Sequence, residues 1–177
     1  MARRRSKANY YTELLIYAAV VGLEAVLLSV FSIQQPLVGY MLILVTTCIA
    51  GMNCGKGGGL IVGLVAGLAS FVCGFAGSVF AAPMIYKVLV ACVPKMLMGF
   101  TVGLIYRKMA RKINYVLAGV LCVMIGLVIN AFGVFAVLFV GSLLDGSMSN
   151  IDLLATLKRV FYSFVRLGKS ILYIVVL

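Results

Sequence analysis

Residues 57–112 read GGGLIVGLVAGLASFVCGFAGSVFAAPMIYKVLVACVPKMLMGFTVGLIYRKMARK. This stretch holds two apolar segments, Gly57–Cys73 and Val88–Tyr106, separated by a turn-rich connection around Pro83. Each segment is close to the roughly 20 residues that a helix needs to cross the hydrocarbon core of a bilayer. The second segment stops at the basic cluster 107–112, which is typical of the cytoplasmic end of a membrane helix. The stretch therefore predicts two transmembrane helices joined by a short loop.

Glycines recur at four-residue spacing in both segments. The first segment carries Gly59, Gly63 and Gly67, and the second carries Gly99 and Gly103. Residues four apart lie on one face of a helix, and a glycine face lets a neighbouring backbone approach closely in lipid. We expect each of these helices to pack closely against a neighbouring helix through its glycines.

The composition of the whole chain agrees with a membrane protein. Hydrophobic residues make up 64% of 177, the mean hydropathy is +1.21, and charged residues make up only 11%. A soluble domain carries about a quarter charged residues. Most of the net charge of +11 lies at the ends of apolar segments, where basic residues set topology, so nucleic acid is not an expected partner.

Catalytic and metal-binding patterns are absent from the sequence. The chain has no histidine and no paired catalytic carboxylates, so we expect neither an enzyme nor a cofactor or metal site. The five cysteines are scattered and never spaced as CxxC, which favours small apolar side chains inside helices. They are Cys48, Cys54, Cys73, Cys92 and Cys122.

Apolar segments divide the chain into a single transmembrane domain, 1–177, of all-α class. We expect six helices, at about 12–31, 37–51, 58–74, 86–107, 113–140 and 152–177, with a Gly/Asn/Lys turn over Gly51–Gly58. The first segment is too long for a signal-peptide core and has no small-residue cleavage site, so it is expected to remain as a helix. Six crossings place both termini on one side, and the basic residues predict that this side is cytoplasmic.

The last predicted helix carries a cationic face. At about 100° per residue, Arg159, Tyr162 and Arg166 fall within one arc together with Lys158, Lys169 and Tyr173. One interpretation is the wall of a binding cavity, because intramembrane charges usually face a bundle interior. The alternatives are an amphipathic helix in the outer interface, or structural pairing with Glu13 or Glu24.

Other polar residues lie inside apolar segments. Glu24, Lys95 and Asn130 each occupy the interior of a predicted helix, which makes them candidate ligand-binding residues, although Asn130 alone would favour helix packing. Tyr40, like Tyr162, is a candidate wall of the same site. A separate stripe of small residues, Ala18, Gly22 and Ala25 with Ser29, predicts a close helix contact, either inside the bundle or with another protein.

The chain resembles the S components of energy-coupling factor (ECF) transporters, which are six-helix vitamin-binding membrane proteins. The resemblance covers essentially the whole chain and is strongest in GLIVGLVAGLAS, 59–70, and VPKMLMGFTVGLIYRK, 93–108. Lys95 stands where the family usually has arginine, and Val102 where a small residue is common. Ala18-Ala19-Val20-Val21-Gly22 is similar to the AxxxA motif that contacts the family's coupling subunit.

The resemblance implies a subunit that captures a vitamin at the extracellular face of a bacterial plasma membrane. Such a subunit delivers its ligand through a transmembrane coupling subunit powered by two partner ATPases. The cationic residues favour an anionic vitamin, pantothenate first, followed by folate and other carboxylates. The alternative function is a small self-contained channel or secondary transporter.

Overall fold

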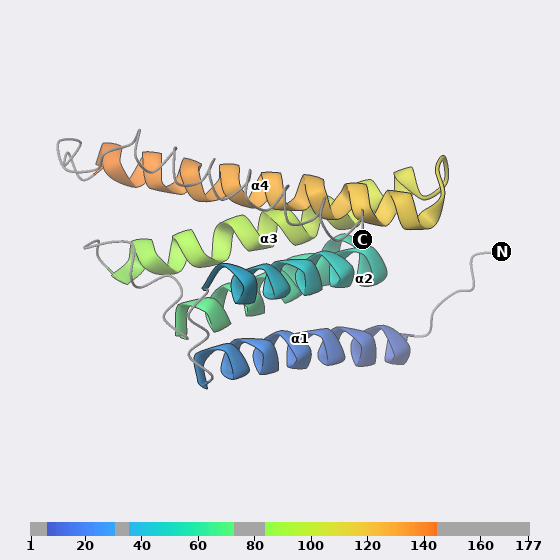
Figure 1. Ribbon diagram of the computed structural model, residues 1–177, viewed down its shortest axis with the longest axis horizontal. Helices are drawn as coiled ribbons and strands as arrows, with labels where there is room; N and C mark the ends of the chain where they lie inside the picture. The colour runs from blue at the N-terminus through green and yellow to red at the C-terminus, as the bar shows by residue number, and fades with distance from the viewer. Residues whose placement is uncertain (1–6, 31–35, 73–83, 145–177) are drawn as a thin grey trace. The chain divides into compact units, whose positions relative to one another are not determined.

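The computed structural model describes residues 7–30, 36–72 and 84–144, and expectations for other residues lie outside this part of the chain. Four helices make up the described part: α1 (Lys7–Val30), α2 (Pro36–Val72), α3 (Met84–Met109) and α4 (Tyr115–Leu144) (Figure 1). No strand occurs within these ranges. The chain divides into two units, Met1–Val137 and Leu138–Leu177, and the bundle described below belongs to the first.

Helix α2 folds back on itself at Gly55. This residue has φ 76° and ψ −170°, which is not a helical conformation and is accessible almost only to glycine. A Cβ atom at Gly59 would lie 2.9 Å from the Cα atom of Gly51, whereas eight residues of straight helix would separate these positions by about 12 Å. Helix α2 is therefore a hairpin with a first arm, 36–54, and a second arm, 56–72.

The predicted turn over Gly51–Gly58 is wrong in its extent. The helical assignment continues through this stretch, and the reversal is concentrated at the single residue Gly55. A glycine without a Cβ makes the reversal in less chain than the sequence suggested, so the two arms stay closely packed up to the turn.

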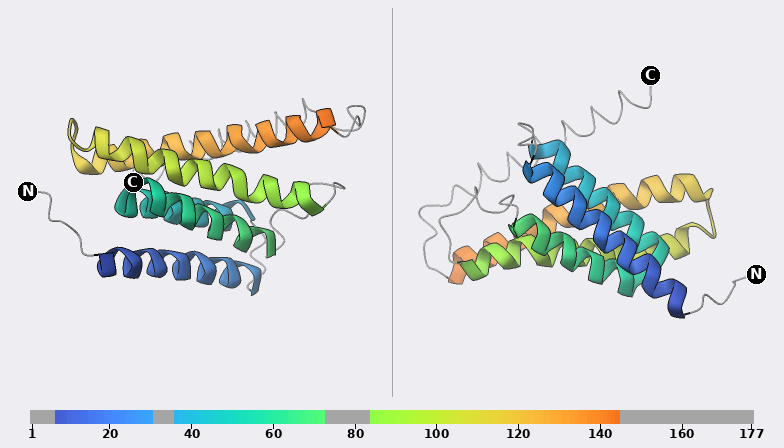
Figure 2. Two further views of the ribbon diagram at one scale, coloured as in Figure 1. Left: turned by 180° about the vertical axis from the view of Figure 1, so that it is seen from behind. Right: turned by 90° about the horizontal axis from the view of Figure 1, so that it is seen from below.

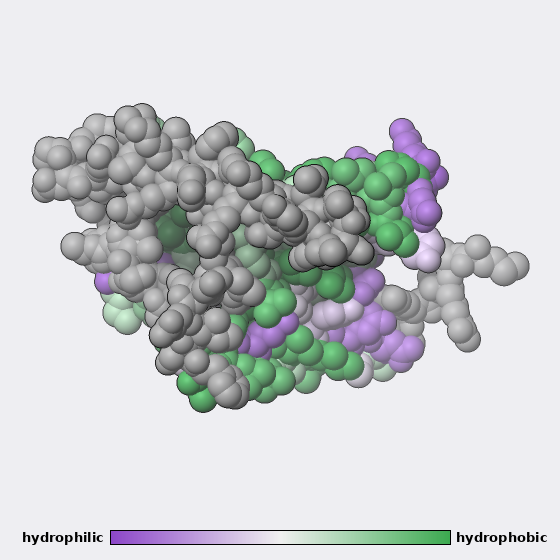
Figure 3. Space-filling view, in the orientation of Figure 1, coloured by the Kyte–Doolittle hydropathy of each residue, from purple (hydrophilic) through white to green (hydrophobic). Residues whose placement is uncertain are grey.

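The described helices are long and apolar enough to cross a membrane. Four candidate spans are found, Ala8–Val30, Met41–Val72, Lys87–Met109 and Tyr115–Val137. Large apolar side chains such as Leu15, Leu23 and Phe132 are exposed on the helix surfaces. Figure 3 shows hydrophobic residues, in green, over much of the described surface in that view. The described part of the chain is therefore all-helical and has the helices of a membrane protein, as predicted. The expected count of six is not reached in the described residues, and the helix expected at 152–177 lies outside them.

The second arm of α2 packs against α3 through the predicted glycines. A Cβ atom at Gly59 would overlap the carbonyl oxygen of Gly99, and one at Gly63 would overlap that of Lys95. Further along, a Cβ at Gly67 would lie 2.5 Å from the Cα atom of Cys92. Backbones meet at all three levels, which confirms the predicted glycine packing and shows that the arm and α3 are antiparallel.

A core of mostly small and branched side chains lies between α1 and the two arms of α2. Its members are buried and come from all three segments: Val21, Ala25, Leu28, Ile43, Ala50, Val62 and Ala66. Small side chains keep these helices close, so α1 is held against the hairpin by dispersion contacts rather than by lipid exclusion.

Basic residues gather at the hairpin-turn end of the first unit. A Cβ atom at Gly55 would overlap the guanidinium group of Arg107, which brings the end of α3 to the turn beside Lys56. The hydroxyl of Tyr10, in the first turn of α1, lies 3.7 Å from a Cβ position at Gly57. The two further views of the ribbon show the start of α1 and the α3–α4 connection at one end (Figure 2).

Candidate functional site

Lys95 is the largest of the fully buried side chains in the described residues. It is 2% exposed, and its Nζ atom donates a hydrogen bond of 3.0 Å to the carbonyl oxygen of Ala91 in the preceding turn of α3. A lysine at the centre of a membrane helix costs about 2.5–3.5 kcal/mol on insertion scales. A buried lysine in a bundle this small is therefore a candidate for binding rather than for packing.

Glu24 links α1 to the first arm of α2. Its Oε1 atom accepts a hydrogen bond of 2.7 Å from the hydroxyl of Thr46. The other carboxyl oxygen, Oε2, is buried and has no hydrogen-bond partner among the described residues. A buried polar atom without a partner costs about 1–3 kcal/mol, so this oxygen is available to a donor group of a ligand.

Asn130 lies on the face of α4 that meets α3. The residues about one turn to either side, Gly126 and Gly133, show where this face lies: Cβ atoms there would be 3.2 Å from Met98 and 3.0 Å from Pro94, respectively. Asn130 is between them on the same face and is 5% exposed. Its height along α3 is therefore that of residues 94–98, which includes Lys95.

The first arm of α2 brings Thr46 to the same height. Gly51 meets the backbone of α3 at Gly99 and Gly103, and the first arm runs parallel to α3. Thr46, five residues before Gly51, therefore lies beside residues 94–98 of α3, which include Lys95. The register therefore places Glu24, Thr46, Lys95 and Asn130 in one transverse layer of the bundle, which we call the polar layer.

The polar layer joins three of the predicted site residues and adds one that the sequence analysis missed. Thr46 and its buried neighbour Thr47 form a pair of hydroxyls inside an apolar segment, a signal that was present in the sequence. Thr47 donates to the carbonyl of Ile43 in its own helix. Only Thr46 therefore reaches across to another helix.

The remaining predicted site residues are not placed by the structure. Arg159, Tyr162 and Arg166 lie outside the described residues, and Tyr40 is in α2 but its side chain is outside the described ones. Their assignment to a binding site stays a prediction, as does the choice between a cavity wall and an interfacial helix.

The stripe of small residues on α1 is divided between two environments. Ala25 is buried in the core against α2, whereas a Cβ atom at Gly22 would have no neighbour within 4 Å among the described residues. Ala18, between these extremes, is half-buried. One edge of the stripe therefore packs inside the bundle, and Gly22 leaves room for a further helix.

No protein-family model, curated protein or solved structure matches this chain. The resemblance to ECF S components therefore rests on the motifs quoted from the sequence.

Proposed function

We propose that this chain is the substrate-binding membrane subunit of an ATP-driven vitamin importer of the ECF type. The observation that carries the proposal is the buried Lys95 within the polar layer of an otherwise apolar bundle. Ionisable groups inside membrane proteins are retained where they bind a substrate or an ion, because their burial is otherwise unfavourable.

The chemistry of the polar layer favours an anionic ligand that also carries a donor. The ammonium group of Lys95 attracts a carboxylate strongly in a desolvated site. The Oε2 atom of Glu24 and the amide of Asn130 lie in the same layer and suit a hydroxyl or amide of the ligand. Pantothenate combines a carboxylate, an amide and hydroxyls, and remains the first choice among vitamins.

The arrangement of charge supports an orientation with the N-terminus in the cytoplasm. Lys56 and Arg107 lie at the hairpin-turn end, near the start of α1, and membrane proteins keep such basic ends cytoplasmic. This orientation is the one expected for six helices, and the assignment of Arg159, Arg166, Tyr40 and Tyr162 to ligand binding stays a prediction from the sequence. The sequence has no nucleotide-binding motif, so the energy comes from two partner ATPases acting through a coupling subunit.

The test is native mass spectrometry of the purified protein, followed by thermal-shift measurements across a panel of vitamins. We expect a bound or stabilising carboxylate vitamin, and loss of that effect in Lys95→Met. Lys87→Met, on the same helix but nearer its start, is the matched control and should retain binding. Stabilisation by a neutral vitamin would agree with a vitamin-binding subunit but would contradict the role of Lys95 in binding a carboxylate.

The competing function is distinguished by reconstitution in liposomes. A binding subunit alone should hold the ligand without moving it across the bilayer. Transport by the purified chain without any ATPase would overturn the proposal and favour the channel or secondary transporter.

A further inference from the structure

Sulfur-bearing side chains from three helices lie along one face of α4 in its first half. Cys122, on α4, donates its thiol proton to the Sδ atom of Met109, at the end of α3, over 3.9 Å. Cys122 is fully buried, and Met109 is partly exposed. A thiol and a thioether from different helices thus face each other.

Two further sulfur atoms from the first arm of α2 lie beside the same face of α4. A Cβ atom at Gly126 would be 2.8 Å from the Sγ atom of Cys48, and one at Gly119 would be 3.9 Å from the Sδ atom of Met52. Cys122 comes three residues after Gly119 and four before Gly126, on the same face of the helix. Along α4, Cys122 therefore lies between the positions beside which the sulfur atoms of Met52 and Cys48 are found.

We propose that these four residues, Cys48, Met52, Met109 and Cys122, form a binding site for a soft monovalent metal ion, with Cu(I) as the expected species. Thiolate and thioether ligands together select Cu(I) over harder ions. We call this set the sulfur cluster. It is separate from the polar layer, and its test does not depend on vitamin binding.

The distance between the sulfur atoms of Cys122 and Met109 fits a shared ion. With metal–sulfur bonds of about 2.3 Å, as for zinc–thiolate, two ligands of a trigonal ion are about 4 Å apart. The Cys122 Sγ to Met109 Sδ distance of 3.9 Å has this value before any ion is bound. The Sγ atom of Cys48 lies beside Gly126, one turn beyond Cys122 on the same face of α4, and is the candidate third ligand.

Charge balance favours a monovalent ion at this place. The cluster lies inside segments that cross the membrane, where an uncompensated charge is costly. One cysteine releases its thiol proton to solvent and the resulting thiolate neutralises Cu(I), while the second cysteine, as a neutral thiol, and the thioethers add bonds without adding charge. A divalent ion would need both cysteines deprotonated, and zinc further prefers imidazole and thiolate ligands, whereas this chain has no histidine.

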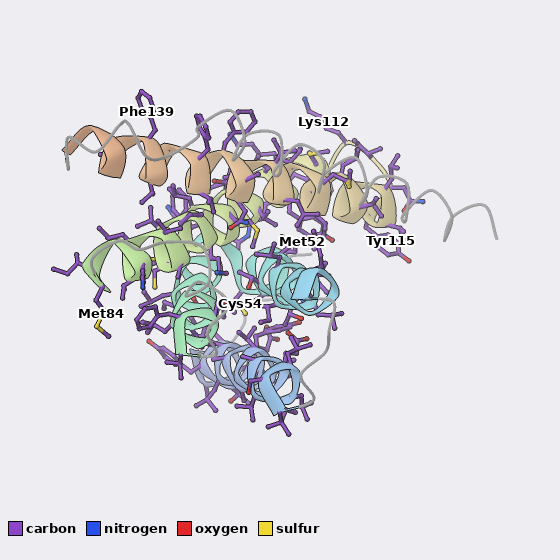
Figure 4. The ribbon with its side chains drawn as sticks, turned by 60° about the vertical axis from the view of Figure 1, so that its left-hand side comes forward. Met52, Cys54, Met84, Lys112, Tyr115 and Phe139 are labelled. Carbon is purple, nitrogen blue, oxygen red and sulfur yellow. The ribbon has the colours of Figure 1, made fainter. Side chains whose placement is uncertain are left out.

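The cluster also has a gradient of exposure. Met52 and Met109 are partly exposed, whereas Cys48 and Cys122 are fully buried. Figure 4 shows Met52 on the side of α2 that faces α4, while Cys54 lies toward α1. An ion would therefore meet the thioethers first and the thiols second.

The experiment is an anaerobic titration of the reduced, detergent-solubilised chain with Cu(I), using bathocuproine disulfonate as the competing coloured chelator. We expect the chain to withdraw one equivalent of Cu(I) from the chelator. The double variant Cys48→Ser/Cys122→Ser should lose this withdrawal, and Met109→Leu should weaken it. The matched control Cys54→Ser/Cys92→Ser removes two other buried cysteines and should bind as the unaltered chain does.

Equal binding by the two double variants, or no withdrawal by the unaltered chain, would overturn the proposal. Because a serine variant can fail by misfolding, X-ray absorption of the copper-loaded unaltered chain gives a second measurement. A first shell of sulfur atoms alone is expected, and a shell of nitrogen or oxygen would place the ion elsewhere.

Discussion

The hydroxyl of Thr46 donates a hydrogen bond of 2.7 Å to Glu24 and so joins α1 to the first arm of α2 inside the apolar bundle. This bond holds one carboxyl oxygen and leaves the other, Oε2, buried without a hydrogen-bond partner among the described residues. The bond from Thr46 thereby orients the carboxyl group of Glu24, and the second oxygen can accept a hydrogen bond from a ligand.

Replacement of Thr46 by valine should destabilise the protein by about 1 kcal/mol. Interhelical hydrogen bonds in membranes average about 0.6 kcal/mol, and this one leaves a carboxyl oxygen unsatisfied when it is lost. Thermal unfolding in detergent measures the change. Thr47→Val is the matched control, because Thr47 bonds within its own helix and should lose less.

A double-mutant cycle separates the bond from general packing. In a Glu24→Leu background, Thr46→Val should have little further effect, since the acceptor is already gone. An unchanged cost in that background would show that Thr46 stabilises the helices in another way.

Gly63→Ala should be strongly destabilising, by about 1–3 kcal/mol or more, because its methyl group would overlap the carbonyl oxygen of Lys95. The backbone atom cannot move away without separating α2 from α3. Gly22→Ala is the control, since a Cβ atom there has open space among the described residues and alanine favours the helix. The ratio of folded protein to aggregate after heating reports both changes, and equal losses would contradict the close glycine contact.

Gly55→Ala should cost about 1–3 kcal/mol, because φ 76° with ψ −170° is essentially a glycine-only conformation. The new Cβ would also displace the guanidinium group of Arg107. Gly57→Ala, two residues away, would meet only the Tyr10 hydroxyl at 3.7 Å and should be tolerated. The measurement is the unfolding temperature of the two variants. Equal unfolding temperatures would contradict a chain reversal at Gly55.

A cysteine placed at Lys112 should be labelled by a membrane-impermeant maleimide only from the cytoplasmic side. Lys112 is exposed in the connection between α3 and α4, whereas the four cysteines in the described residues are buried. Labelling in inverted vesicles but not in intact cells is the expected result. The reverse pattern would invert the proposed topology and place the basic end outside.

The sequence by itself determined the class of the protein and the glycine faces through which two of its helices pack. Apolar segments of membrane-spanning length predict helices through composition alone, because backbone groups in lipid must bond within their own segment. The glycine faces of the second arm and of α3 could be predicted because the four-residue spacing of their glycines is visible within a short stretch of sequence. Lys95, Glu24 and Asn130 were found individually for the same reason, since each interrupts an apolar segment.

Only the tertiary structure decided which of these residues share a height in the bundle. The meeting of Thr46 with Glu24, and of Cys122 with Met109, depends on the register between helices, which is fixed by contacts far apart in the chain. The reversal at Gly55 sets that register, because it determines where the first arm lies along α3. Periodicity in the sequence predicts which residues share one face of a helix, whereas the register between two helices is set by their packing. The polar layer and the sulfur cluster both depend on this register.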